Sequence, residues 1–152
     1  MTPNTGRTHS KYVTVKLDNS GGTLTDLTAY CNSVGTLGLT FDSQDVTAFS
    51  DEVKNVVVGQ PAGTITLGGP FDTAIVTHMA AIVGLNVPLS LGILIGVRHA
   101  WESGEPTFGL SMSATSGYLC TGFTVEISAN TWQATFDVFG PTAPVWSTSA
   151  IT

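Results

Sequence analysis

The stretch YLCTGFTVEISANTWQATFDVF, residues 118–139, alternates apolar and polar side chains on both sides of a short turn. Alternation with a period of two is typical of half-buried β-strands. In the first half, Phe123, Val125 and Ile127 share one face. In the second half, the shared face consists of Trp132, Ala134, Phe136 and Val138. We therefore predict two strands, over 118–128 and 130–139, joined tightly around Ala129 and Asn130.

Shorter runs of the same kind lie upstream. The expected strands cover residues 12–17, 23–31, 34–41, 64–67, 89–97 and 107–113. One segment is helical instead, because its apolar residues recur at spacings of three and four, at Phe71, Ile75, Met79 and Ile82. Pro70 suits its first turn and Gly84 its end. The sequence therefore predicts a mainly β protein, a β-sandwich or barrel of about seven to eight strands with one flanking α-helix over about 70–84.

The chain divides into three expected segments. They are a polar N-terminal arm at 1–10, a single β-sandwich domain at 11–139, and a C-terminal extension at 140–152. A length of 152 residues suits one such domain. In the extension, Pro141 and Pro144 do not easily continue a strand, yet Trp146 is costly to leave in water. We expect the extension to dock onto this subunit or onto a neighbouring one.

Charge and composition favour assembly over nucleic-acid binding. Lys and Arg number 5 against 11 Asp and Glu, a net charge of -6. This balance disfavours a tight grip on DNA or RNA, although an acidic surface can face DNA without holding it. Charged residues make up 11% of the chain, against about 25% in an average domain. We therefore expect neighbouring subunits to cover part of the surface.

The cysteines and the longest apolar stretch fit a chain made in a reducing cytoplasm. Cys31 and Cys120 lie far apart without C-x-x-C spacing, which favours buried free thiols over a disulfide. The N-terminus lacks the apolar core of a signal peptide. Residues 75–97 approach the length of a membrane span, but Gly84, Asn86 and Pro88 interrupt them, so we expect a buried helix followed by a buried strand and no membrane span.

No motif for catalysis is present in the sequence. His9, His78 and His99 show neither H-x-x-x-H nor H-E-x-x-H spacing, and there is no G-x-S-x-G elbow or phosphate-binding glycine loop. We therefore expect no enzyme activity, no catalytic residue, no cofactor and no metal ion.

Two other groups of residues can be interpreted as binding sites. The carboxylates of segment 42–59, which are Asp42, Asp45, Asp51 and Glu52, miss the spacing of a calcium loop. A solvated or subunit-contacting loop is preferred. A second cluster of Trp101, Trp132 and Trp146 suits a sugar-binding surface, but aromatic residues on strands are more often core.

Several segments resemble a known family. The run LDNSGGTLTDLTAY at 17–30 resembles the opening hairpin of tail tube (major tail) proteins from long-tailed bacteriophages. Further on, DVTAFSD at 45–51 resembles that family's D-V-T-T-F-G-D segment, with Ser50 in place of Gly, and 54–59 resembles its K-x-x-x-x-G continuation. Residues 62–67 resemble the strand that enters the single helix. The similarity covers about 11–84 well and 117–139 more loosely.

The resemblance implies a virion protein of the phage tail, made in the host cytoplasm. Copies would join as hexameric rings that stack into a tube, bind other tail proteins, and let DNA pass through the lumen without tight binding. Segment 42–59 would reach a neighbouring subunit, with Phe49 as apolar anchor and Asp45, Asp51 and Lys54 as polar contacts. Trp146 is a fifth candidate subunit contact.

Two alternatives remain open. A capsid decoration or cement protein would also be small, β-rich and poor in charge, and would bind the major capsid lattice. A carbohydrate-binding domain is a more distant third.

Overall fold

The computed structural model describes residues 13–95, 105–149 and 151–152. Its first sheet has the strand order β11-β8-β7-β1-β2, with every neighbouring pair antiparallel. The strands of this sheet are β1 (Val13–Asp18), β2 (Leu24–Asp26), β7 (Leu91–Ile95), β8 (Thr107–Leu110) and β11 (Val145–Ser147). A short 3-10 helix, η2 (Thr28–Tyr30), follows β2.

The second sheet has the order β3-β6-β10-β9 and is also antiparallel. Its strands are β3 (Ser33–Val34), β6 (Thr64–Pro70), β9 (Gly117–Glu126) and β10 (Thr131–Phe139). The opening stretch thus forms the β9–β10 hairpin. Asn130 makes its turn possible by adopting a φ of 55°, a left-handed conformation that Asn tolerates.

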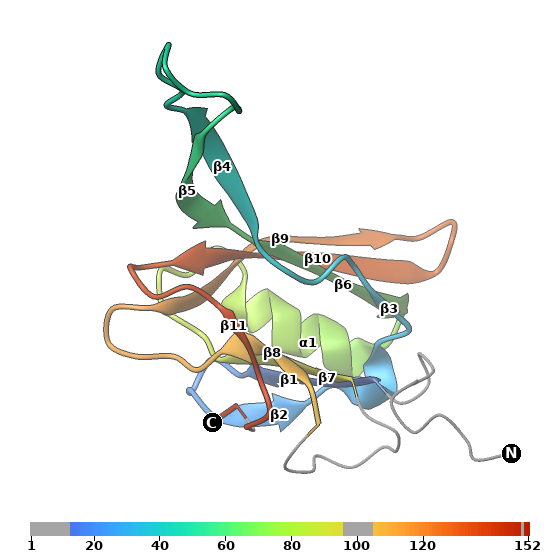
Figure 1. The fold of residues 1–152 in the computed structure, drawn as a ribbon. Coiled ribbons are helices and arrows are strands. Elements are labelled where there is room, and N and C mark those ends of the chain that lie inside the picture. Colours follow the sequence, from blue (N-terminus) through green and yellow to red (C-terminus); the bar gives the residue numbers. More distant parts are fainter. Residues whose placement is uncertain (1–12, 96–104, 150) are drawn as a thin grey trace, which may run out of the picture.

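The inner faces of the two sheets meet in one core (Figure 1). On the first sheet, Val15 pairs with Ile93, which in turn pairs with Phe108. On the second sheet, Phe136 pairs with Ile65, and all five of these side chains are at most 1% exposed. Burial at this level stabilises by about 1.5–3 kcal/mol for each large apolar side chain. The core therefore joins the two sheets into a sandwich.

Helix α1 (Thr73–Ile82) lies between the two sheets and adds three buried side chains, those of Ile75, Met79 and Ile82. It begins later than expected, because the carboxylate of Asp72 accepts a hydrogen bond from the backbone N–H of Ala74 at 2.7 Å and so caps the helix. Pro70, expected in the first turn, is the last residue of β6.

A third, two-stranded sheet consists of β4 (Thr40–Asp45) and β5 (Val56–Ala62). Figure 1 shows this hairpin standing away from the sandwich. Hereafter residues 40–62 are called the hairpin arm. Gly63 alone separates it from β6.

The fold class is therefore confirmed: the described residues form a β-sandwich with one α-helix and no closed barrel, while the details differ. The described residues contain eleven strands rather than about seven to eight, because several have only two or three residues. The helix is shorter than 70–84. In the extension 140–152, Pro141 and Pro144 lie outside any strand, and the short strand β11 that follows them pairs with β8 of the same subunit. Pro144 directly precedes β11, a position where its missing N–H costs no ladder hydrogen bond.

Candidate subunit-contact surfaces

The hairpin arm is exposed along its whole length. All residues of β4 and β5 are exposed, including Phe41, Val56, Val57 and Val58, each at least half exposed. The strands pair only with each other within the described residues. An isolated two-stranded hairpin is marginally stable in water, and a flat apolar ribbon invites pairing with another chain. The arm therefore has the physical character of a contact surface.

Hydrogen bonds within the arm give its tip a defined shape. The Asp45 carboxylate accepts from the backbone N–H of Thr47 at 2.9 Å and from the hydroxyl of the same residue. The Asp51 carboxylate accepts from the backbone N–H of Ala48 and from Asn55 Nδ2, both at 2.8 Å. The two carboxylates thus hold the two sides of the tip loop, which carries one exposed aromatic residue.

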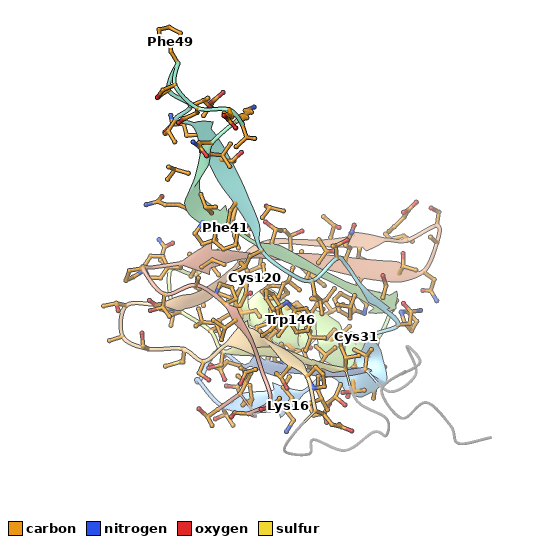
Figure 2. The ribbon with its side chains drawn as sticks, in the orientation of Figure 1. Lys16, Cys31, Phe41, Phe49, Cys120 and Trp146 are labelled. Atoms are coloured by element: carbon orange, nitrogen blue, oxygen red, sulfur yellow. The ribbon has the colours of Figure 1, made fainter. Side chains whose placement is uncertain are left out.

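That residue is Phe49. Its relative exposure is 114%, so the ring projects from the tip without packing against the arm, as Figure 2 shows. A fully exposed phenylalanine forgoes the roughly 1.5–3 kcal/mol that burial of its side chain would contribute. Phe49 is therefore an apolar residue at the far end of the hairpin arm, the element that protrudes most from the sandwich.

The tip carboxylates are held in their charged form. The hydroxyl of Thr47, followed by its backbone N–H, lowers the pKa of Asp45. The backbone N–H of Ala48, followed by Asn55, lowers the pKa of Asp51. Lys54 Nζ lies 3.9 Å from Asp45 Oδ2 with both side chains largely exposed, a pair of little energetic weight. A contact of these three residues with another subunit stays a prediction, since the structure shows what they do within one chain.

Trp146 lies apart from the arm, on the sandwich (Figure 2). It is on β11 at the edge of the first sheet, opposite Phe108, with ring centroids 5.0 Å apart. The indole remains 52% exposed. The structure therefore brings four of the five predicted contact residues together in the arm and places the fifth on a separate surface.

A third surface escaped the sequence reasoning. The outward side of the second sheet carries mostly hydroxyl and other polar groups, and we call it the hydroxyl face; its residues are Thr64, Thr66, Leu119, Thr121, Thr124, Glu126, Thr131, Gln133, Thr135 and Asp137. None of the residues in β3, β6, β9 and β10 is Lys, Arg or His. The alternation of threonine with apolar residues was the available signal, but it does not tell which exposed face is functional.

A β-bulge shapes the centre of this face. The register between β9 and β10 shifts where Thr135 pairs with Gly122 and Phe136 with Cys120, so Thr121 is the extra residue. Its hydroxyl donates to Asp137 Oδ2 at 2.7 Å, and Thr64 donates to Asp137 Oδ1 at 2.6 Å. Both oxygens of the carboxylate are thereby occupied by neighbours on the flanking strands.

Other chemically interesting residues form no site. Cys31 and Cys120 are free of disulfides, and burial, aided by the nearby charge of Asp26, raises the pKa of the Cys31 thiol to about 12. In the part of the chain that the structure describes, no three His, Cys, Asp or Glu residues gather as metal ligands. Within the same residues, no helix has the length and apolar character of a membrane span.

Comparison with known proteins supports the fold. No protein family and no curated protein matches the chain in sequence. Among solved structures, it resembles a chain of an extracellular contractile injection system, the PVC sheath–tube complex in its extended state, with a TM-score of 0.56 and 17% identity over 94% of this chain and 93% of that chain. A chain of the anti-feeding prophage (AFP) baseplate is 10% identical, with a TM-score of 0.49 and 97% of each chain covered.

The fold is thus shared with a chain of a contractile injection system's sheath–tube complex. The residues at 17–30 and 45–51 resemble tail tube proteins of long-tailed bacteriophages. At 17% identity the likeness establishes the architecture alone.

Proposed function

We propose that this protein is a structural tube subunit that associates with copies of itself into hexameric rings, and that the rings stack into a phage tail tube. The observation that carries the proposal is the hairpin arm of residues 40–62, an exposed two-stranded ribbon with large apolar side chains on β5 and at the tip, standing on a sandwich with a buried core. The shared fold with a chain of a sheath–tube complex supports it.

In this tube the hydroxyl face lines the channel. A conduit needs a surface that stays hydrated and does not hold its cargo. Threonine hydroxyls and Gln133 are neutral, Asp137 and Glu126 are acidic, and the strands that carry them have no cation to bind phosphate. DNA would therefore pass this face without tight binding. The subunit would belong to the virion tail, be made in the host cytoplasm, and bind other tail proteins at the tube ends.

Exposed strand edges support growth beyond one chain. β9 is an edge strand of ten residues in the second sheet, and β3 covers the opposite edge over only two residues. Such edges are sites where a second chain adds its own strand. A closed ring of subunits joined edge to edge would remove them, as closure does in a barrel.

Electron microscopy of the purified chain tests the proposal. We expect six-fold rings and tubes that lengthen with concentration. Small closed oligomers that bind only capsids would instead support a decoration protein, and a monomer at every concentration would refute self-assembly.

Thiol labelling tests the assignment of the channel face. Gln133→Cys places a thiol on the hydroxyl face, and Ala80→Cys places one on the exposed side of α1. In tubes, a small maleimide should label Gln133→Cys while a long polyethylene-glycol maleimide should not, except at the tube ends. In dissociated subunits both reagents should react. Equal reaction of the long reagent with Gln133→Cys tubes and subunits would place this face outside the channel.

A further inference from the structure

The segment between α1 and β7, residues 84–90, covers part of the free edge of β9. The backbone N–H of Gly84 donates to the carbonyl oxygen of Cys120 at 3.0 Å. Leu89 and Tyr118 exchange two backbone hydrogen bonds, each 2.9 Å long. Among the described residues, the C-terminal half of β9 has no strand on this side. Because an uncovered strand edge invites pairing with another chain, the position of segment 84–90 decides how much of β9 is open.

The far end of segment 84–90 is held by Asp18, the last residue of β1. The register continues from Leu17 opposite Leu91 to Asp18 opposite Ser90, and the Asp18 N–H donates to the Ser90 carbonyl at 3.0 Å. In a regular antiparallel pair, the Ser90 N–H would return a bond to the Asp18 carbonyl. It donates instead to the Asp18 carboxylate, at 2.8 Å, and this bond is buried. The Asp18 carbonyl is thereby left for a different donor.

That donor is His78 on α1, whose ring forms a hydrogen bond with the Asp18 backbone. The Nε2 atom of the ring is shielded from solvent and has no hydrogen-bond partner among the described residues. The neutral imidazole therefore carries its proton on Nδ1, which donates to the carbonyl, and leaves Nε2 as an unused acceptor. Protonation adds a second N–H at a buried position where nothing accepts it. Burial accordingly lowers the pKa of His78, and the hydrogen bond to Asp18 opposes this effect only in part.

The other ionisable groups around α1 do not offset the burial of His78. Segment 84–90 and strands β6, β7 and β8 contain none. Burial raises the pKa of Tyr118 and of Cys120, so both side chains are neutral below about pH 8. On the remaining neighbours, Lys16 and Asp18 of β1 have opposite charges, while Glu126 and Asp137 lie on the hydroxyl face, away from α1.

We propose that His78 is an acid-sensitive switch, in which protonation of the ring detaches α1 from Asp18 and releases segment 84–90 from β9. The imidazolium competes with the Ser90 N–H for the Asp18 carboxylate, since a charged donor forms the stronger hydrogen bond. Release opens the edge of β9 at Tyr118 and Cys120, where another strand can then pair. The switch belongs to the single subunit and does not depend on the proposed tube.

The direction of the pH dependence follows from the burial of the ring. In the released state the ring meets water, so its pKa there is close to the ordinary value of 6.5, while the closed state has a lower one. The released state therefore binds more protons. The stabilisation of the closed state is fully present above pH 6.5 and is lost as the pH falls through the lowered pKa of the folded protein.

Hydrogen exchange of dilute, dissociated subunits tests the switch. Mass spectrometry measures the exchange of segments 83–90 and 117–121 between about pH 7.5 and about pH 5, the range in which histidine titrates. After correction for the intrinsic pH dependence of exchange, protection of both segments should fall by at least about threefold on acidification. Protection of β10, which lies in the same sheet as β9, should not change.

His78→Asn is the decisive variant, because the asparagine amide can still donate to the Asp18 carbonyl and is not protonated in this range. We expect it to lose the acid response. The matched variant His99→Asn also removes one histidine and should keep the response. Equal acid responses of wild type and His78→Asn, or no response in wild type, would overturn the switch. The ring titration of His78 in wild-type protein, followed by NMR, is a second measurement that requires no variant, and a pKa at or above 6.5 would overturn the switch as well.

Discussion

Phe49→Ala should separate assembly from folding. The side chain is 114% exposed, so its removal costs the isolated subunit no packing, and the free energy of unfolding should change by less than about 0.5 kcal/mol. In the proposed assembly the same ring would be buried, and the loss should be about 1.5–3 kcal/mol for each contact. With one such contact per added copy, the critical concentration for tube formation should rise by about 10- to 150-fold.

Sedimentation of tubes over a concentration series measures the critical concentration, and urea unfolding of dissociated subunits measures the stability. Ile127→Ala is the matched control, because it removes an exposed apolar side chain from the β9–β10 hairpin and should change neither quantity. Phe136→Ala is the opposite control. That ring is fully buried, so the subunit should lose about 3–5 kcal/mol of stability. An unchanged critical concentration for Phe49→Ala would show that the ring is not buried between copies.

Combining Phe49→Ala with Asp51→Ala completes the comparison. Asp51 shapes the tip through Ala48 and Asn55, so its loss should weaken assembly by misplacing the ring. The two effects on assembly should then be less than additive, because the second change acts on a ring that is already absent. Full additivity would instead show that Asp51 makes its own contact with the neighbouring subunit.

Three further predictions concern the subunit. Gly69→Ala should destabilise it by more than about 2 kcal/mol in urea unfolding, because the added Cβ would overlap the carbonyl oxygen of Tyr30; unchanged stability would contradict this packing. The neutral Cys31 thiol stabilises the fold below pH 9, and this contribution should be lost as the pH rises from 9 toward 12; Cys31→Ala should therefore show a smaller fall in the urea midpoint over that range than wild type, and equal slopes would refute the assignment. Asp51→Asn should increase chymotrypsin cleavage after Phe49 several-fold while the matched Asp42→Asn does not, because only Asp51 accepts from both Ala48 and Asn55 in the tip; equal cleavage of the two variants would count against that role.

The sequence predicted what depends on local pattern. Residues 118–139 alternate apolar and polar side chains and carry Asn130 at a tight turn, so both strands and their hairpin could be predicted. The sandwich core followed from the same alternation. The start of the helix was missed because Pro70 and Asp72 are both acceptable near an N-terminus, and the hydrogen bond from Ala74 that selects Asp72 is visible only in three dimensions.

The contact surfaces were harder to predict, because exposure is a property of the whole fold. Val56, Val57 and Val58 form an apolar run that periodicity alone cannot distinguish from a buried strand, yet all three are exposed. The bulge at Thr121 moves a hydroxyl next to Asp137 from a strand sixteen residues away in sequence. Family resemblance found the arm at Phe49, and it gave no indication of the hydroxyl face.

The two surfaces differ in the property that their proposed roles require. In the proposed tube, apolar area on the arm leaves water when copies meet, and each Å² contributes about 25 cal/mol to holding them together. A threonine hydroxyl on the channel face exchanges one hydrogen bond with water for another, so contact with a passing molecule yields little net free energy. The hydrogen bonds to Asp137 increase this difference, because the hydroxyls of Thr64 and Thr121 already occupy both carboxylate oxygens. The same short chain can thus bind its neighbours firmly and release what moves past it.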